Sequence, residues 1–484
     1  MTRSVGRRGA RGTDGGLRHD RLQFSTKPPP RASLPRVPPV LRSPKLRRII
    51  FAYTVNRLGT WFGLLALLIA VYDHTHSALA VAALMFAGQA LPAFAVPVLV
   101  ARVEVSKRRS ELARLYVFEA LVTTGLALLL GNFSLPAVLV LVFLDGTAAL
   151  AASALLRAEV ARAAREQEAS AAPPGAEGSA DAGGEGKGRH RAEREANAAL
   201  NVAFSSTFVL GPALGGLVVA ALGASAALLI DVASFLVCGA LLVDLSQHVE
   251  EAGAGTVRDR LAAAWRHITE VPWLRWLLLG QLLAMIFIET GAPIEVPFVK
   301  STLGAGDGGL GLLLTMWGAG AVLGSIWFAR LIGRPLWQLL GAGTLMIGAA
   351  YLGLAVSRSL APACIAGLVG GVGNSMQWPA LISIVQRLTP ERLHGRLMGA
   401  VESLGAVCLA IGLSLGGVLV TLSSTRTAFT IVGIGAVASS VVLARIARLA
   451  LGAAQTGEHH DREEHRAAAG GSAAVVEHGA TRHA

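Results

Sequence analysis

The chain has 484 residues, of which 53% are hydrophobic and only 15% are charged. A soluble globular protein carries about 25% charged residues, so this composition excludes an ordinary soluble domain and indicates an α-helical membrane protein with many spans. The net charge of +12 does not indicate a nucleic-acid partner, because the basic residues gather in alternate loops between apolar runs, as in membrane-protein topology.

The N-terminal 47 residues are rich in Arg, Gly and Pro and contain no apolar core of a signal peptide, which predicts a disordered tail. About twelve apolar runs follow, each long enough to cross a bilayer as a helix. Their predicted bounds are 49–72, 77–101, 111–131, 135–157, 198–221, 224–244, 273–298, 306–329, 336–356, 360–385, 395–421 and 426–449. An even number of spans places both termini on one side of the membrane.

The distribution of basic residues predicts which side that is. The N-terminal tail and the even-numbered loops hold most of the Arg and Lys residues, whereas the odd-numbered loops hold almost none. Because positively charged loops stay in the cytoplasm, we expect a multi-pass protein of the cell membrane with both termini in the cytoplasm.

Two similar glycine patterns indicate that the chain contains a repeat. Gly211, Gly215 and Gly216 lie in the fifth span, and Gly412, Gly416 and Gly417 recur 201 residues later in the eleventh. Glycines four apart let membrane helices approach closely, so these six residues are predicted to pack helices together. The first and seventh spans are about 224 residues apart, which predicts an insertion in the first half.

The chain is therefore divided into five parts. They are a disordered basic tail (1–47), an N-terminal six-helix half (48–245) with a flexible insertion at about 167–192, a cytoplasmic linker (246–272), a C-terminal six-helix half (273–450) and a disordered His-rich tail (451–484). In the linker, Val257, Leu261, Trp265 and Ile268 share one helical stripe, which predicts an amphipathic helix on the inner membrane surface.

Three segments resemble signatures of a known family. They are Ala196-Asn197-Ala198 with the first glycine pattern, Asp231-Val232-Ala233-Ser234-Phe235 in the sixth span, and Gln386, Thr389-Pro390-Glu391 and Gly395-Arg396 around the tenth loop. Over about 49–450, the chain resembles the bacterial drug-antiporter branch of the major facilitator superfamily, which includes macrolide-efflux and enterobactin-exporter-like proteins. The resemblance implies two pseudo-symmetric six-helix halves, alternating access, and proton-driven export across the bacterial cytoplasmic membrane by a monomer that needs no cofactor.

The loop after the second span departs from that superfamily's usual Asp-Arg-x-x-Arg. It reads Ala101-Arg102-Val103-Glu104-Val105-Ser106-Lys107-Arg108-Arg109, which keeps the basic residues and lacks the Asp, with Glu104 as a shifted substitute. The predicted cytoplasmic gate consists of Arg102, Glu104, Lys107, Arg108 and Arg109, together with Arg396 and Glu402 near the start of the eleventh span.

Ionisable side chains inside a bilayer are costly and normally face a wet cavity or a partner. Arg57, beside Asn56, lies at a depth of about 12 Å in the first span, and Asp145 near the middle of the fourth span is its candidate partner. Asp145 either forms a static ion pair with Arg57 or carries a proton, and the sequence leaves both open. Glu289 in the seventh span has no basic partner in its half, which favours a proton or cationic-substrate site.

Other polar residues inside spans complete the predicted site. Asn374 and Gln377 in the tenth span share a helix face and precede Pro379, so they either line the substrate cavity or make polar contacts between helices. Glu119 and Asp231 are interpreted as structural. The predicted cavity therefore contains Asn56, Arg57, Asp145, Glu289, Asn374 and Gln377.

An enzyme is not predicted. The run from Gly412 to Gly416 matches the G-x-S-x-G pattern of a nucleophile elbow but lies within a span, and no ATPase motif or resident metal site is expected. We expect a secondary transporter that exports amphipathic small molecules, such as antibiotics or secondary metabolites, with protons as the coupling ion. An importer or uniporter of a small solute and a transport-inactive membrane scaffold are the alternatives.

Overall fold

The computed structural model describes residues 43–94, 111–171, 182–243, 266, 268–331, 333–389 and 393–480, which all belong to one compact unit, Pro39–Ala484. These residues form twelve α-helices, two of which continue into a short π-helical segment. The predicted all-α polytopic fold is therefore confirmed.

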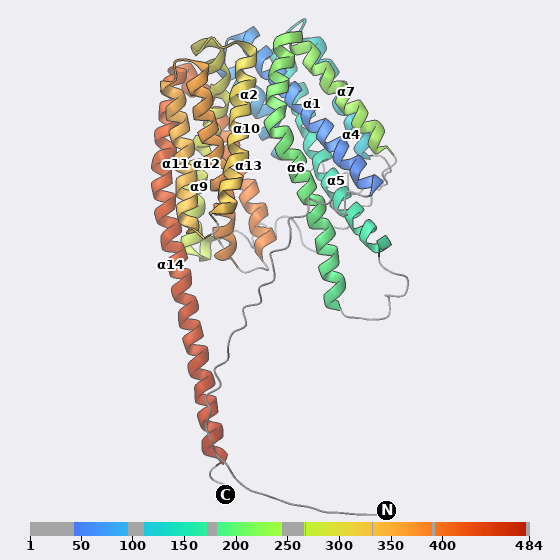
Figure 1. The fold of residues 1–484 in the computed structure, drawn as a ribbon. Helices are drawn as coiled ribbons and strands as arrows, with labels where there is room; N and C mark the ends of the chain where they lie inside the picture. Colours follow the sequence, from blue (N-terminus) through green and yellow to red (C-terminus); the bar gives the residue numbers. More distant parts are fainter. Residues whose placement is uncertain are drawn as a thin grey trace, which may run out of the picture. The chain divides into compact units, whose positions relative to one another are not determined.

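The helices follow the chain in two sets. The first contains α1 (Pro44–Thr75), α2 (Ala78–Met85) with η2 (Phe86–Ala90), α4 (Glu111–Leu129), α5 (Leu135–Ala171), α6 (Ala182–Leu222) and α7 (Ala224–Leu242). The second contains α9 (Pro272–Pro297) with η4 (Phe298–Thr302), α10 (Gly306–Arg330), α11 (Leu336–Val356), α12 (Leu360–Arg387), α13 (His394–Leu422) and α14 (Thr425–Ala480). Figure 1 shows the two sets as two bundles that run side by side. We call them the N half and the C half.

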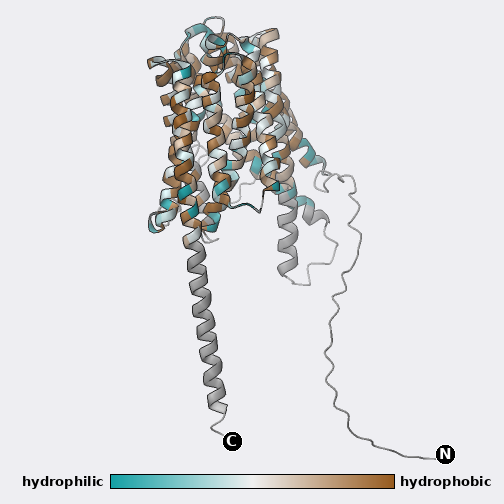
Figure 2. Ribbon diagram, turned by 60° about the vertical axis from the view of Figure 1, so that its left-hand side comes forward, coloured by the Kyte–Doolittle hydropathy of each residue, from teal (hydrophilic) through white to brown (hydrophobic). Residues whose placement is uncertain are grey.

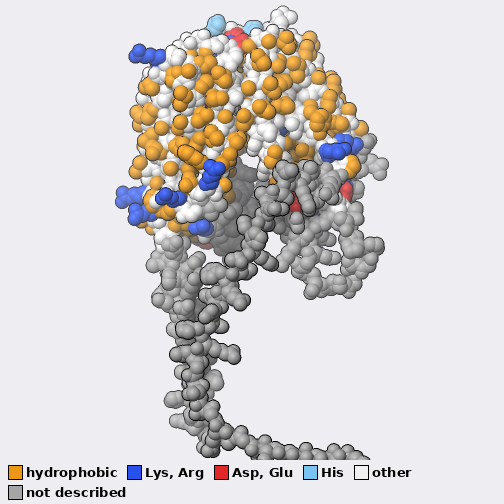
Figure 3. All heavy atoms as spheres, in the orientation of Figure 1, with side chains coloured by type: hydrophobic (Ala, Val, Ile, Leu, Met, Phe, Trp, Pro, Cys, Tyr) orange, Lys and Arg blue, Asp and Glu red, His pale blue; other side chains and the backbone are white. Residues whose placement is uncertain are grey.

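The surface of the bundle is that of a membrane protein. Ten of the described helical segments are long and apolar enough to cross a membrane. Large apolar side chains face outward, such as Leu121 and Ile365, each 67% exposed. Hydrophobic residues run along most of each helix in Figure 2, and in Figure 3 apolar side chains cover the visible face while Lys and Arg gather mainly toward its lower end. An apolar surface of this extent suits a hydrocarbon environment.

In three places the helices extend further than the sequence predicts. Helix α5 continues to Ala171 and α6 begins at Ala182, so most of the predicted flexible insertion is helical, and α14 continues to Ala480 through the predicted disordered tail. Ala is the commonest residue of both regions, and it favours helix even where polarity suggests a loop. Helix α1 begins at Pro44, because Ser43 accepts a hydrogen bond from the backbone N–H of Leu46 and caps it. The predicted linker helix falls almost wholly outside the described residues.

Among the described residues, one buried core cluster joins the two halves, and it lies at one end of the bundle. One cluster contains residues of both halves, among them Tyr72 and Val81 with Phe298 and Phe429. Two further clusters belong to one half each; the first includes Leu46, Leu156 and Leu242, and the second includes Leu274, Ile384 and Leu443. The halves therefore share a core near the end of α1 that carries Asp73, which we call the Asp73 end, and have separate cores near its beginning.

The two glycine patterns pack in the same way. Gly211 and Gly215 contact Trp61 and Phe62 of α1 in the N half, as Gly412 and Gly416 contact Glu289, Thr290 and Pro293 of α9 in the C half. The third glycine of each pattern faces the opposite half. A Cβ on Gly216 would lie 2.8 Å from Cα of Gly311 in α10, and a Cβ on Gly417 would lie 2.6 Å from Cβ of Ala82 in α2. Both helix crossings therefore require glycine.

An ion triad also joins the halves at the Asp73 end. Lys300 Nζ lies 2.5 Å from Oδ1 of Asp73 and 2.6 Å from Oδ1 of Asp307. Asp73 belongs to α1, whereas Lys300 and Asp307 belong to η4 and α10, so one of the two contacts crosses between halves. The shared core, the glycine crossings and this ion pair together close the Asp73 end.

Candidate functional site

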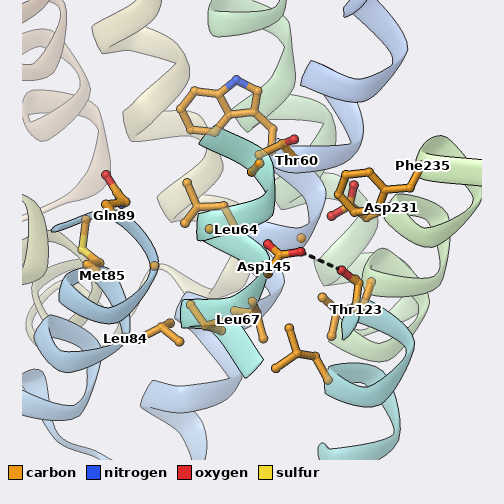
Figure 4. A pocket seen from close by; sticks show the side chains of 18 of the residues that line it. Thr60, Leu64, Leu67, Leu84, Met85, Gln89, Thr123, Asp145, Asp231 and Phe235 are labelled. Carbon is orange, nitrogen blue, oxygen red and sulfur yellow. Dashed lines mark hydrogen bonds between the residues drawn. The ribbon is translucent and has the colours of Figure 1, made fainter. Parts of the chain in front are cut away.

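A cavity of about 360 Å³ lies among the helices of the N half (Figure 4). Its volume falls in the range of small-molecule sites. Most of its lining is apolar or aromatic and includes Trp61, Leu64, Leu67, Met85, Leu126, Val142, Phe208, Leu228 and Phe235. The polar side chains that line it are Arg57, Thr60, Gln89, Thr123, Asp145 and Asp231. The cavity is thus an apolar chamber with a few ionisable groups.

Asp145 of α5 lies at the wall of this chamber. Its Oδ1 accepts a hydrogen bond of 3.3 Å from the Thr123 hydroxyl of α4, the dashed line in Figure 4. The neighbouring Gly146 lets α5 approach η2, since a Cβ there would collide with the backbone carbonyl of Gly88. Close packing of three helices therefore places this carboxyl at the cavity wall.

Asp231 of α7 is a second carboxyl at the same cavity. Its Oδ1 accepts a hydrogen bond of 3.2 Å from the Ser234 hydroxyl. A Cβ on Gly59 would lie 2.5 Å from that oxygen, and a Cβ on Gly63 would collide with Oδ2. The two glycines, four residues apart on α1, thus leave a groove that admits the Asp231 carboxyl.

Glu119 of α4 is the third carboxyl of the group. It is buried, and its Oε2 has no hydrogen-bond partner within the described part of the chain. The N half therefore contains carboxyls on three of its helices, and two of them, Asp145 and Asp231, line the cavity.

Arg57 supplies a basic group at the same cavity. Its guanidinium lies over the Phe204 ring, 5.3 Å from the ring centroid, and its buried Nε has no hydrogen-bond partner among the described residues. No ion pair within 4.0 Å joins it to Asp145 or Asp231, all three of which are described. Of the two roles left open for Asp145, the static ion pair with Arg57 is not formed.

Four predicted cavity residues do not line this chamber. Gln377 is buried and donates a hydrogen bond of 3.3 Å to Gln281 of α9, so it makes the polar contact between helices that was the alternative. Glu289 on α9 packs against Gly412. Asn56 and Asn374 are half-buried on α1 and α12 and are absent from the cavity wall.

The structure describes little of the predicted cytoplasmic gate. Residues 95–110 lie outside the described residues, and with them the predicted gate residues Arg102, Glu104, Lys107, Arg108 and Arg109. Arg396 and Glu402 belong to α13, but their side chains are not among those described. This part of the prediction stays a prediction.

Sequence reasoning missed Asp231 and Thr123 as members of one site. The sequence analysis interprets Asp231 as structural. The spacing of Gly59 and Gly63 was the available signal, because a small-xxx-small pair on the first span predicts a close neighbour there. Only the fold shows that this neighbour is a carboxyl.

Comparison with known proteins finds one family model and one curated relative that are similar to this chain. A family model described as Major Facilitator Superfamily matches residues 277–477. A relative named Uncharacterized MFS-type transporter YfiS, from Bacillus subtilis (strain 168), is 24% identical over 241 residues, which is 47% of this chain and 58% of the relative. The chain thus matches less than two thirds of that relative's length.

Solved structures share the fold over most of their length. A bacterial homologue of the iron transporter ferroportin in the inward-facing state matches with a TM-score of 0.63 and 16% identity, over 83% of this chain and 98% of that one. The nucleoside transporter NupG matches with a TM-score of 0.57 and 11% identity, over 84% of this chain and 99% of that one. The human organic anion transporter MFSD10 (TETRAN) matches with a TM-score of 0.54 and 19% identity, over 84% of this chain and 100% of that one. At these identities the solved structures show a shared fold, and the family model matches the part of the chain that forms most of the C half.

Proposed function

We propose that the chain is a secondary active transporter of the major facilitator superfamily that exports amphipathic small molecules in exchange for protons. The observation that carries the proposal is the apolar chamber of the N half, into which Asp145 and Asp231 project without a cationic partner among the described residues. In this proposal the membrane is a bacterial cytoplasmic membrane, and both termini lie in the cytoplasm.

The carboxyls suit the binding and release of protons. An ionisable group in a span normally has a partner of opposite charge, because the bilayer supplies none. Within the described ranges, Asp145 and Asp231 instead receive hydrogen bonds only from the hydroxyls of Thr123 and Ser234. A proton neutralises such a carboxyl when no cation does, so its uptake and loss can be linked to the binding of substrate in the same chamber.

The walls suit an amphipathic substrate. Aromatic rings from three helices, Trp61, Phe208 and Phe235, surround the chamber. Trp61 and Phe208 meet edge to face, with centroids 5.5 Å apart. Such a wall binds apolar groups over a large area, whereas the polar side chains orient the rest of the molecule.

The arrangement of the halves supports alternating access. The Asp73 end is closed by a shared core and by the Lys300–Asp73 ion pair, whereas the cores near the start of α1 are separate. The distribution of basic residues predicts that the closed end faces outward. Similarity to a structure described as inward-facing supports the same state for this chain. Export would proceed when the halves rock and the Asp73 end opens.

Transport into everted membrane vesicles with an imposed pH gradient tests the proposal. We expect the wild-type protein to accumulate the amphipathic dye ethidium when the vesicle lumen is acidic, and Asp145→Asn to remove the dependence on the gradient. The matched control is Glu111→Gln, at the beginning of α4 and 19% exposed. Accumulation that requires the opposite gradient would indicate an importer, and gradient-dependent uptake by both Asp145→Asn and Asp231→Asn would contradict the proton assignment.

A further inference from the structure

The cavity of the N half holds groups of opposite charge that do not neutralise each other. Arg57 lines the same 360 Å³ as Asp145 and Asp231, yet no ion pair within 4.0 Å joins the guanidinium to either of these described carboxyls. Opposite charges inside a membrane protein attract strongly and usually pair. Here the packing of separate helices holds them apart, which leaves both without a partner of opposite charge in the described structure.

The side of the cavity near Arg57 has an unused donor. The guanidinium has five N–H groups, and Arg57 makes no hydrogen bond in the described structure beyond its contact with the face of Phe204. A guanidinium fork matches a carboxylate in geometry and charge. This side of the cavity therefore suits an anionic group of a ligand.

The side near Asp145 and Asp231 has unused acceptors. Within the described part of the chain, each carboxyl accepts one side-chain hydrogen bond, from Thr123 or Ser234, although a carboxylate can accept about four. Asp231 lies beside Gly59 and Gly63, about one turn of α1 away from Arg57, so the axial offset is roughly 6 Å. A ligand that makes one charge-assisted hydrogen bond of about 2.8 Å to Arg57 and another to Asp231 can span much of this offset.

We propose that the substrate bound in this cavity is a compact amphipathic zwitterion, whose carboxylate binds Arg57 and whose ammonium binds Asp145 and Asp231. Its apolar part lies against Trp61, Phe208 and Phe235. A bound zwitterion supplies Arg57 and the two carboxyls with partners of opposite charge, which the described residues do not provide. This inference rests on the proposed transport function, because it names the substrate class for the same cavity.

Equilibrium binding of three matched fluorescent probes to the full-length protein in lipid nanodiscs tests the inference. The probes are Nε-dansyl-L-lysine, which is a zwitterion; its α-methyl ester, which lacks the carboxylate; and its Nα-acetyl derivative, which lacks the ammonium. We expect the zwitterion to bind at least about tenfold more tightly than either derivative, since each derivative loses one charged hydrogen-bonded contact. Empty nanodiscs correct for partition into lipid.

Substitutions at the two sides assign each contact. Arg57→Gln is expected to weaken the zwitterion about tenfold and leave the ester unchanged, and Arg57→Lys to restore part of the loss. Asp145→Asn is expected to weaken the zwitterion and leave the acetyl derivative unchanged. Glu111→Gln is the control on the same fold, and melting temperatures confirm that each variant is folded.

Three outcomes overturn the inference: equal binding of the three probes, no binding of any probe, or an equal effect of Arg57→Gln on all three. The measurement uses no gradient, so it is separate from the test of proton-driven export. If transport by the wild type does not depend on the gradient but the zwitterion is still bound selectively, only the proposed proton coupling is wrong. If the gradient drives ethidium transport but the zwitterion is not bound selectively, only this inference is wrong.

Discussion

The N half and the C half pack alike but differ in chemistry. In both halves a glycine pattern rests on the first helix of its own half and then crosses to the opposite half, through Gly216 in one case and Gly417 in the other. The polar groups differ. In the C half, Gln377 and Gln281 satisfy each other, whereas in the N half Arg57 and Asp145 share a cavity without pairing.

This difference separates scaffold from site. A repeated pattern of small residues maintains the helix crossings that both halves need in order to move against each other. Unpaired ionisable groups lower stability and persist where they have a function. We therefore expect substitutions in the glycine patterns to act equally in both halves, and substitutions of ionisable groups to act mainly in the N half.

The largest effect is expected at the two glycine crossings. Gly216→Ala and Gly417→Ala should each reduce transport by about tenfold or more, because a Cβ at either position collides with the facing helix and opposes closure of the Asp73 end. Gly131→Ala is the control, since its Cβ would meet nothing nearer than 3.6 Å. Initial rates of dye transport check this. A strong effect of only one of the two substitutions would contradict the expectation that the two crossings are equivalent.

Next in size is the glutamine contact of the C half. Gln377→Leu should destabilise the protein by about 1–3 kcal/mol, because the buried Gln281 side chain loses its hydrogen bond from Gln377. The double variant Gln281→Leu/Gln377→Leu should regain most of that loss, since both polar groups are then absent. Thermal unfolding in detergent measures the stability of the single and double variants. Their transport rates are compared per amount of folded protein. If the double variant loses transport while remaining stable, the two glutamines have a role in transport and their contact is not merely structural.

The smallest effect is expected at the ion triad. Asp73→Asn removes the contact between halves, whereas Asp307→Asn removes a contact within the C half, so only the first should loosen the Asp73 end. The change in exposure should be at most about fivefold, because partly exposed ion pairs contribute roughly 1 kcal/mol or less. Labelling of Leu67→Cys by an impermeant maleimide from the Asp73 side measures it, in a background where Cys238, Cys364 and Cys408 are alanine. Equal labelling in both variants would argue against a latch between the halves.

The helices were predictable because apolar runs of membrane length leave few alternatives. The ends of the helices were not. Residues 167–171 and 182–192 and those after residue 451 lie in polar stretches that suggest loops, yet Ala, the commonest residue of both stretches, favours helix there. Polar residues in spans were visible, but not their partners. Asp231 joins Asp145 because of a groove between Gly59 and Gly63, whereas Gln377 turns to Gln281, and both outcomes depend on packing across helices.

The central claim is that coupling resides in the carboxyls of the N-half cavity. Its most direct measurement is proton release by the purified protein on addition of substrate, followed with a pH indicator in weakly buffered detergent solution, with Nε-dansyl-L-lysine as ligand. We predict proton release by the wild type and by Glu289→Gln, and its loss in the double variant Asp145→Asn/Asp231→Asn. Release that persists in the double variant, or disappears only in Glu289→Gln, would contradict the account.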